Sequence, residues 1–520
     1  MTLKTALCTL AFGLLAQSMG EPSALPERNI VIDLQKTTGP FDRFYDLSVG
    51  SDYPGTLLRD DSLRQLAIVR NELGFRYIRF HAIFHDVLGT YRLADGKPVY
   101  DWMKVDALVD ALLHIGIKPF VELGFTPKAM ATSGNSIFYW QGNTSHPDPK
   151  LWAQLVETFV RHIEGRYGRA EARTWFFEVW NEPNLSGFWE GADQNAYFDL
   201  YELTARTLKA VDPELKVGGP ATAGAAWVSD FISRVQARGV PLDFITTHSY
   251  GVDGGFLDEA GRSDTKLSPS PDAIVGDVRR VRGEITASAL PNLPLYFTEW
   301  STSYTPRDLV HDSYISAPYI LSKLKASRGR LQGMSYWTYS DLFEESGPPP
   351  TAFHGGFGLM SRDGIRKPAW FAYKYLHELG DTELKTGDTQ SFTTRQGDAI
   401  QCLIWDFYQP VQDKSNRPFY SKLVPTAIGN TVVLGVKHMK PGSYSLTLRR
   451  TGFRANDAFS AYIDMGSPKD LTAGQLAQLT ALTTDTPQVS IPIIVGRAGI
   501  ATTRLPMRLN DIVLVKIESK

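Results

Sequence analysis

The chain has 520 residues, of which 43% are hydrophobic, 12% aromatic and 21% charged, and its formal net charge at pH 7 is −2. This length is enough for two or three domains, and the composition is that of a globular chain with a large core rather than a disordered one. Near-neutral charge, with no long run of Lys or Arg, disfavours nucleic acids and anionic membranes as partners.

The first 20 residues have the pattern of a secretory signal peptide. One Lys precedes an apolar run from Ala6 to Ala16, which is followed by small and polar residues. The run is too short to span a membrane, and the alternative is an ordinary buried helix. The only cysteines are Cys8 and Cys402, so removal of the signal peptide leaves no intrachain disulfide. The sequence predicts a secreted or periplasmic bacterial protein.

From residue 40 to residue 380, short apolar runs alternate with amphipathic segments. Strands are predicted at 44–50, 76–84, 117–125, 174–184, 215–221, 243–250, 294–301 and 331–341. Helical periodicity follows each strand, at 61–74, 101–116, 149–168, 196–211, 227–239, 271–285, 316–327 and 367–380. Eight such pairs predict an α/β fold, a (β/α)8 TIM barrel. A doubly wound open sheet is the alternative, but the Gly-rich phosphate loop expected after its first strand is absent.

After about residue 380 the pattern changes to alternating apolar and polar residues between turns. Only the segment 472–482 has helical periodicity there. This predicts an accessory antiparallel β-sandwich domain. The early segment "RNIVIDLQK" is expected to add a strand to it. The predicted organisation is therefore a signal peptide (1–20), a catalytic barrel (40–380) and a sandwich built from residues 21–39 and 381–520.

Polar residues cluster at the C-terminal ends of the predicted barrel strands, where TIM barrels carry their active sites. Taken singly, a strand-end Glu is usually an ion-pair partner, a lone His is structural and a Trp belongs to the core. The joint pattern favours chemistry, because two Glu residues end aromatic-rich strands four and seven and can face each other across the barrel mouth. The residues concerned are Arg79, His81, Glu122, Asn181, Glu182, His248, Tyr250, Glu299, Trp337 and Asp341.

Two facing carboxyl groups suit glycoside hydrolysis. One carboxylic acid protonates the leaving oxygen, and the other carboxylate stabilises or attacks the oxocarbenium-like carbon. A separation of about 5–5.5 Å gives retention of configuration, and about 6.5–9.5 Å gives inversion. The sequence alone does not contain this distance.

Five motifs occur in order along the chain: "FEVWNEPNLSGFW", "THSY", "YFTEWS", "YWTYSDLFEE" and "FHGGFGL". Together they resemble glycoside hydrolase family 39, which holds β-xylosidases and α-L-iduronidases within the clan of retaining (β/α)8 glycosidases. The matches extend from about Phe44 to Gly380.

The resemblance implies that Glu182 is the general acid/base and Glu299 the nucleophile. Asn181 would hydrogen-bond the sugar 2-hydroxyl, Arg79 would keep Glu299 ionised, and Tyr250 would bond the nucleophile. The remaining residues implied to bind or enclose the sugar are His81, His248, Trp337 and either Glu344 or Glu345, of which Glu345 is preferred, with Phe188, Trp189 and His354 as pocket walls.

Glu178 shares strand parity with Glu182 and is interpreted as a structural or supporting acid. The loops after strands six and eight are acidic and poor in Lys, which favours a neutral pentose over a uronic acid. The predicted function is exo-acting β-D-xylosidase on xylooligosaccharides; the alternatives are an α-L-iduronidase, an α-L-arabinosidase and a sugar-binding protein without catalysis. No metal or cofactor is expected, and the oligomeric state is left open.

Overall fold

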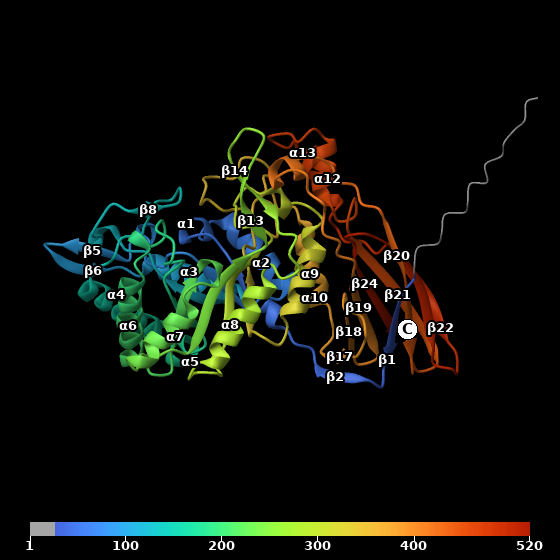
Figure 1. Ribbon diagram of the computed structural model, residues 1–520, viewed down its shortest axis with the longest axis horizontal. Helices are drawn as coiled ribbons and strands as arrows, with labels where there is room; N and C mark the ends of the chain where they lie inside the picture. The colour runs from blue at the N-terminus through green and yellow to red at the C-terminus, as the bar shows by residue number, and fades with distance from the viewer. Residues whose placement is uncertain (1–26) are drawn as a thin grey trace, which may run out of the picture.

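The computed structural model describes residues 27–520, so the predicted signal peptide lies outside the described part of the chain. The chain folds into a barrel with helices around it, flanked by two sheets built mainly from its C-terminal third (Figure 1). The predicted fold class is confirmed. Eight strands close the barrel in the order β10-β11-β12-β15-β16-β3-β4-β7, and every neighbouring pair is parallel. Their bounds are β3 Ser48–Gly50, β4 Tyr77–Phe80, β7 Lys118–Leu123, β10 Phe176–Val179, β11 Lys216–Thr222, β12 Phe244–Tyr250, β15 Leu295–Ser301 and β16 Gly333–Tyr336.

The barrel interior is layered because side chains alternate between the two faces of a strand. At the N-terminal end an aromatic layer closes the barrel: the rings of Phe120 and Phe176 stack at 4.8 Å, and Phe244 and Tyr296 pack beside them. Two residues further along each of these four strands, a polar side chain points inward by the same alternation: Glu122, Glu178, Thr246 and Thr298. The apolar plug therefore sits below a polar layer that opens toward the C-terminal ends of the strands.

One main helix follows each barrel strand. Their bounds are α2 Asp60–Leu73, α3 Met103–Ile115, α4 Pro149–Tyr167, α6 Gln194–Val211, α7 Val228–Ala237, α8 Val275–Ala287, α9 Ser316–Ser327 and α10 Pro368–His377, with the short α1 Pro54–Leu57 and α5 Arg169–Ala172 between them. Asp148 caps α4 by accepting a hydrogen bond from the Leu151 N–H, and Gly74 ends α2 in the left-handed conformation. Within residues 27–520, no helix combines the length and the apolarity needed to cross a membrane.

Three small hairpins project from the barrel loops. They are β5–β6 (Tyr91–Ala94 and Lys97–Tyr100), β8–β9 (Ser136–Ile137 and Gly142–Asn143) and β13–β14 (Val252–Leu257 and Ser263–Leu267). The β8–β9 hairpin follows barrel strand β7, and β13–β14 follows β12, so both stand at the end of the barrel where the polar layer opens.

The remaining strands form a three-stranded sheet, β1-β20-β23, and a seven-stranded sheet, β2-β17-β18-β19-β24-β21-β22. The N-terminal segment supplies one strand to each sheet. Within this region α13 agrees with the predicted helix at 472–482, whereas α11 and α12 were not predicted, and β1 pairs with β20 in parallel rather than antiparallel. The domain boundaries themselves stay a prediction. The bounds are β1 Arg28–Asp33, β2 Thr37–Pro40, β17 Thr382–Leu384, β18 Ser391–Gln396, β19 Ala399–Trp405, α11 Asn416–Tyr420, β20 Ile428–Lys437, β21 Gly442–Thr451, α12 Ala458–Asp464, α13 Ala473–Ala481, β22 Val489–Val495, β23 Ala501–Arg508 and β24 Ile512–Ser519.

Candidate active site

A cavity of about 670 Å³ opens at the C-terminal ends of the barrel strands. Seven of the nine predicted site residues line it; the other two, Arg79 and His248, are fully buried and hydrogen-bonded to carboxylates that line it. The seven are His81, Asn181, Glu182, Tyr250, Glu299, Trp337 and Glu345. A second cavity of about 690 Å³ lies among α12, α13 and β21, and it contains none of the predicted site residues.

Arg79 is the hub of the polar layer below the cavity. Its guanidinium donates to Glu178 at 2.5 Å, to Glu299 at 2.7 Å and to the Asn181 side-chain oxygen at 2.8 Å, and Glu122 lies 3.1 Å away. Burial acts to lower the pKa of Arg79, but the surrounding carboxylates raise it overall. A buried cation thus compensates several buried carboxylates, and its hydrogen bond orients the carboxylate of Glu299, the nucleophile candidate.

Glu178, which the sequence left without an assigned partner, belongs to this layer. It is two residues after Phe176, so its side chain follows that ring into the barrel, where it is fully buried. One oxygen accepts from Arg79 and the other accepts from the Thr298 hydroxyl at 2.8 Å. Glu178 therefore anchors the arginine, which in turn contacts Glu299.

His81 links two more carboxyl groups beside the cavity. Its Nδ1 lies 2.7 Å from Glu122 and its Nε2 lies 3.1 Å from Glu345. Burial acts to lower the pKa of His81, but the carboxylate of Glu122, and that of Glu345 when it is ionised, raise it well above its ordinary value. Burial raises the pKa of Glu345 to about 8. The preference for Glu345 over Glu344 agrees with the geometry, because Glu344 points to Arg59 at 3.1 Å.

Glu182 stands at the start of the loop after β10. Its backbone has φ 44°, and its N–H donates to the Ala221 oxygen at 2.8 Å, which connects this loop to β11. The side chain is buried, and burial raises the pKa of Glu182 to about 7. No Lys or Arg among residues 27–520 is ion-paired with this carboxyl group, and its one side-chain partner there is His248 at 2.9 Å. The carboxyl group is therefore suited to hold a proton at neutral pH.

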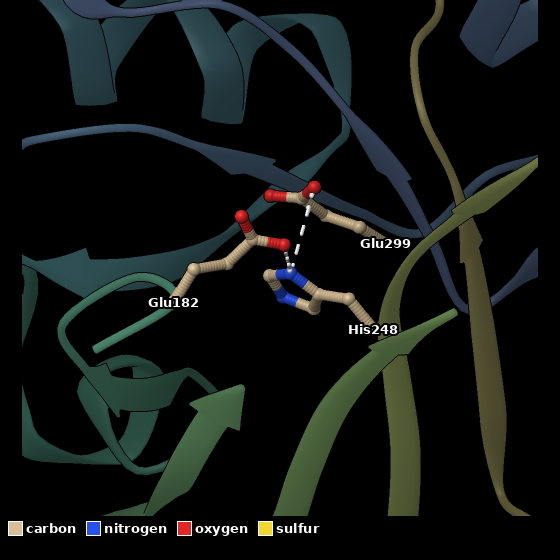
Figure 2. Close-up of side chains that lie close together, drawn as sticks. All are labelled: Glu182, His248 and Glu299. Carbon is tan, nitrogen blue, oxygen red and sulfur yellow. Dashed lines mark hydrogen bonds and ion pairs between the residues drawn. The ribbon is translucent and has the colours of Figure 1, made fainter. Parts of the chain in front are cut away.

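Glu299 lies near the C-terminal end of β15, in a different environment. Besides the ion pair with Arg79, its second oxygen accepts from the Tyr250 hydroxyl at 2.6 Å. Figure 2 shows His248 between the two glutamates, with Nδ1 2.9 Å from Glu182 and 3.6 Å from Glu299. Two donors on one carboxylate hold its position, as the nucleophile candidate requires.

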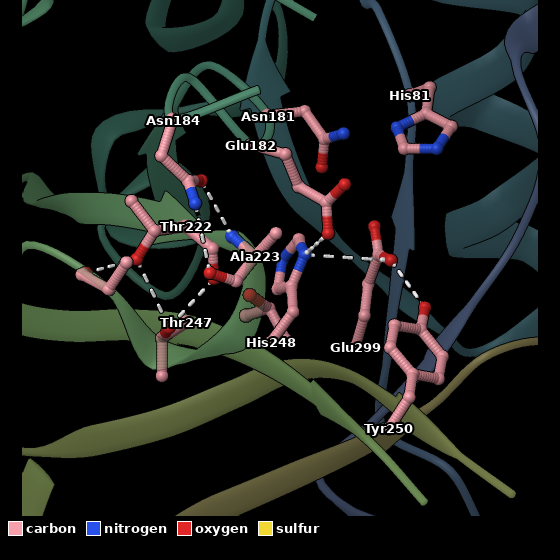
Figure 3. A network of polar contacts seen from close by, with 12 residues as sticks. His81, Asn181, Glu182, Asn184, Thr222, Ala223, Thr247, His248, Tyr250 and Glu299 are labelled. Carbon is pink, nitrogen blue, oxygen red and sulfur yellow. Dashed lines mark hydrogen bonds and ion pairs between the residues drawn. The ribbon is translucent and has the colours of Figure 1, made fainter. Parts of the chain in front are cut away.

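His248 is the neutral member of this group. Burial lowers the pKa of His248 to about 4, and its Nε2 is buried without a hydrogen-bond partner among the described residues. Because Nδ1 faces oxygens of both glutamates, we assign the ring proton to Nδ1, from which it donates to Glu182. Figure 3 places this ring among Glu182, Glu299 and Tyr250.

The same three residues are the group in the described chain that could hold a metal ion. Glu182, His248 and Glu299 each offer one ligand atom, and these atoms lie within 4.8 Å of one another. A metal there would occupy both carboxylates needed for the two-carboxylate chemistry, so the arrangement fits that chemistry without one.

Several residues considered from the sequence lie elsewhere. Trp189 is buried against Trp180 and is not a cavity wall, and His354 does not line the cavity either. Asp341 pairs with the buried Lys367 at 2.5 Å. Phe188 does line the cavity as expected. Sequence reasoning missed the apolar wall residues. Leu185 lies inside the quoted motif around Glu182, whereas the others come from segments without a catalytic motif: Ile137, Phe138, Val252, Tyr304 and Pro306.

Comparison with known proteins identifies the family of the chain. The model of the family "Glycosyl hydrolases family 39" matches residues 28–499. The crystal structure of the GH39 enzyme from Xanthomonas axonopodis pv. citri superposes with TM-score 0.95 at 60% identity, covering 98% of this chain and all of that one. A monomeric β-xylosidase from Caulobacter crescentus CB15 gives TM-score 0.93 at 62% identity, with coverage of 95% and 99%. A β-xylosidase of Caldicellulosiruptor saccharolyticus is 40% identical over 86% of this chain and 90% of its own. The chain belongs to family 39 of the glycosyl hydrolases.

Proposed function

We propose that this chain is a retaining β-D-xylosidase that releases xylose from the non-reducing end of xylooligosaccharides. The observation that carries the proposal is the pair Glu182 and Glu299 in one cavity, with a carboxylate oxygen of each within 4.8 Å of the other. Oxygens this close favour the retaining class, whose carboxyl groups are about 5–5.5 Å apart, over the inverting class at about 6.5–9.5 Å.

In the first step, Glu299 attacks the anomeric carbon and the glycosidic C1–O bond breaks. The leaving oxygen takes the proton from Glu182, whose pKa of about 7 leaves about half of it protonated at pH 7 and most of it below that pH. Since His248 donates to one oxygen of Glu182, the acidic proton is placed on the other oxygen. The product is a covalent glycosyl-enzyme on Glu299.

In the second step, a water molecule attacks the same carbon and the bond to Glu299 breaks. Glu182 is now a carboxylate and accepts the proton of the water. Ester formation at Glu299 removes the negative charge next to Glu182, which lets the pKa of Glu182 fall and makes it a base. Glu299 becomes a carboxylate again, and Arg79 and Tyr250 donate hydrogen bonds to it.

The lining of the cavity favours a neutral sugar. Among the described residues that line it there is no Lys or Arg, whereas Glu182, Glu299 and Glu345 contribute carboxyl groups. A uronic acid would bring a carboxylate into this lining without a Lys or Arg to bind it, and His81, whose pKa is raised, is already paired with Glu122 and Glu345. This argues against the α-L-iduronidase alternative, and the relatives named β-xylosidase support the pentose; the α-L-arabinosidase alternative is separated by experiment.

A screen of 4-nitrophenyl glycosides tests the proposal. The β-D-xyloside should have the highest kcat/KM, above the α-L-arabinoside, the β-D-glucoside and the α-L-iduronide. Hydrolysis of the iduronide alone would overturn the substrate, and sugar binding without any turnover would favour a non-catalytic binding protein. Export to the periplasm or medium rests on the signal-peptide pattern of residues 1–20 and is proposed on that basis.

A further inference from the structure

The carboxylate of Glu299 has a cationic neighbour on one side and an uncharged neighbour on the other. One oxygen accepts from Arg79, whose guanidinium also donates to the Asn181 side-chain oxygen at 2.8 Å. The other oxygen accepts from the Tyr250 hydroxyl at 2.6 Å. Figure 3 shows Asn181 and Tyr250 on opposite sides of this carboxylate. A sugar ring bound over Glu299 therefore meets two different environments.

This difference in charge orients the sugar ring. Carbon 1 of a pyranose has two neighbours in the ring, which are carbon 2 with its hydroxyl group and the ring oxygen. The ring oxygen gains positive charge in the oxocarbenium-like transition state, so it is favoured beside Tyr250 rather than beside Arg79. The hydroxyl group at carbon 2 then faces the amide nitrogen of Asn181, which makes no hydrogen bond within residues 27–520. Carbon 5 follows the ring oxygen and lies on the Tyr250 side.

Phe357 is the buried apolar wall on that side. Tyr250 packs against a cluster of Trp337, Phe343 and Phe357, of which Trp337 and Phe357 line the cavity. The ring of Trp337 also lies 4.8 Å from that of His81, so it extends to the other side of the pocket. Phe357 is 2% exposed and packs against Phe343 at 5.3 Å. A group attached to carbon 5 would meet the ring of Phe357.

The backbone around Phe357 is held by buried charges. Lys367 is fully buried, pairs with Asp341 at 2.5 Å and donates to the Gly356 oxygen at 2.9 Å. Asp341 also accepts from the Gly358 N–H at 2.7 Å. A side chain on Gly356 would lie 2.3 Å from Asp341, which explains a glycine in the motif "FHGGFGL". The ring cannot retreat without disrupting a buried ion pair, which is costly.

We propose that Phe357 determines the specificity for pentoses, because its ring occupies the space of a substituent at carbon 5. This inference deepens the proposed function and rests on it. A pentose carries only hydrogen atoms at carbon 5, and these can pack against the phenyl ring. A hexose carries a hydroxymethyl group there, which would collide with the ring or place its hydroxyl against it without a hydrogen-bond partner.

The test uses two pairs of 4-nitrophenyl glycosides that differ only by the hydroxymethyl group at carbon 5. The β-D-glucoside is compared with the β-D-xyloside, and the β-D-galactoside with the α-L-arabinopyranoside. The value of kcat/KM is measured for each with the full-length wild type and Phe357→Ala. Both hexoside-to-pentoside ratios should rise by roughly 10–200-fold in the variant, the range for one methylene in an apolar pocket. These ratios do not depend on the fraction of active enzyme.

Two controls separate this effect from a general loosening of the pocket. The ratio of xyloside to arabinopyranoside reports recognition at carbon 4, where these sugars differ, and it should stay near its wild-type value. Phe353→Ala is the matched variant, because Phe353 is 3% exposed, packs against Phe459 at 5.7 Å and does not line the cavity. It should keep every ratio. Phe357→Leu is a milder variant that should shift the hexoside ratios in the same direction by a smaller factor.

Unchanged hexoside-to-pentoside ratios in Phe357→Leu and Phe357→Ala would overturn the inference. An equal loss of discrimination at carbon 4 would overturn it as well, because Phe357 would then only maintain the packing. A wild-type enzyme that cleaves the glucoside as readily as the xyloside, or the iduronide alone, would instead show that the proposed function is wrong.

Discussion

The two sides of the active-site cavity place a glutamate side chain in opposite environments. On the β15 side, Glu299 accepts from Arg79 and Tyr250 and sits above a layer of buried charges. On the β10 side, Glu182 has one neutral side-chain partner, His248, and lines the cavity together with apolar residues such as Leu185 and Phe188. We therefore expect surroundings, not residue type, to divide the proposed roles of nucleophile and acid between the two glutamates.

The largest effect is expected when the carboxylate of Glu299 is removed from the charged side of the cavity. Glu299→Ala should lower kcat by roughly 10⁴-fold or more, because no covalent intermediate can form. Azide should partly restore turnover and give a glycosyl azide of inverted configuration, which NMR can identify. Near-wild-type kcat in this variant would show that Glu299 is not the nucleophile.

The next effect separates the acid from the nucleophile. Glu182→Ala should lower kcat/KM by roughly 10²–10⁴-fold for glycosides with poor leaving groups, and much less for 2,4-dinitrophenyl glycosides, which need no acid. A series of aryl glycosides of increasing leaving-group pKa measures this dependence. If the loss is equal across the series, the acid role of Glu182 is wrong.

The pH profile tests the apolar surroundings of Glu182 directly. Its pKa is raised to about 7, and the protonated form is the active one in the first step. On the basic limb of the profile, kcat/KM should therefore be constant at pH values below this pKa and fall about tenfold per pH unit above it. His248, with its pKa lowered to about 4, is neutral throughout this range. If the fall of kcat/KM with rising pH takes place below pH 5, this assignment is wrong.

The smallest effect is expected at Glu345. With its pKa raised to about 8, Glu345 is protonated at neutral pH, so the neutral isostere should replace it well. Glu345→Gln should keep kcat/KM at pH 7 within about threefold, since one neutral hydrogen-bonding group replaces another. Glu344→Gln, at the neighbouring residue that faces Arg59, is the matched control. A loss beyond a hundredfold in Glu345→Gln alone would indicate that Glu345 acts as a carboxylate.

Much of the fold could be read from periodicity. Apolar strands alternating with amphipathic helices predict the barrel, and each of the eight predicted strands overlaps an observed one. The parallel pairing of β1 with β20 was beyond this reasoning, because alternation defines a strand but not its partner or direction. The helix α12 was missed since its seven residues are too short for a clear helical pattern.

The sequence by itself located two glutamates near the C-terminal ends of strands four and seven, and the motifs around them indicated which family the chain belongs to. Tertiary structure decided what those glutamates are chemically. The pKa of Glu182 depends on burial by loops distant in sequence, and Arg79 meets Glu178 and Glu299 only because three strands bring them into one layer. Pairwise distances and desolvation are properties of the folded chain. No local pattern could therefore show that Glu182 holds a proton or identify the apolar side chains that line the cavity.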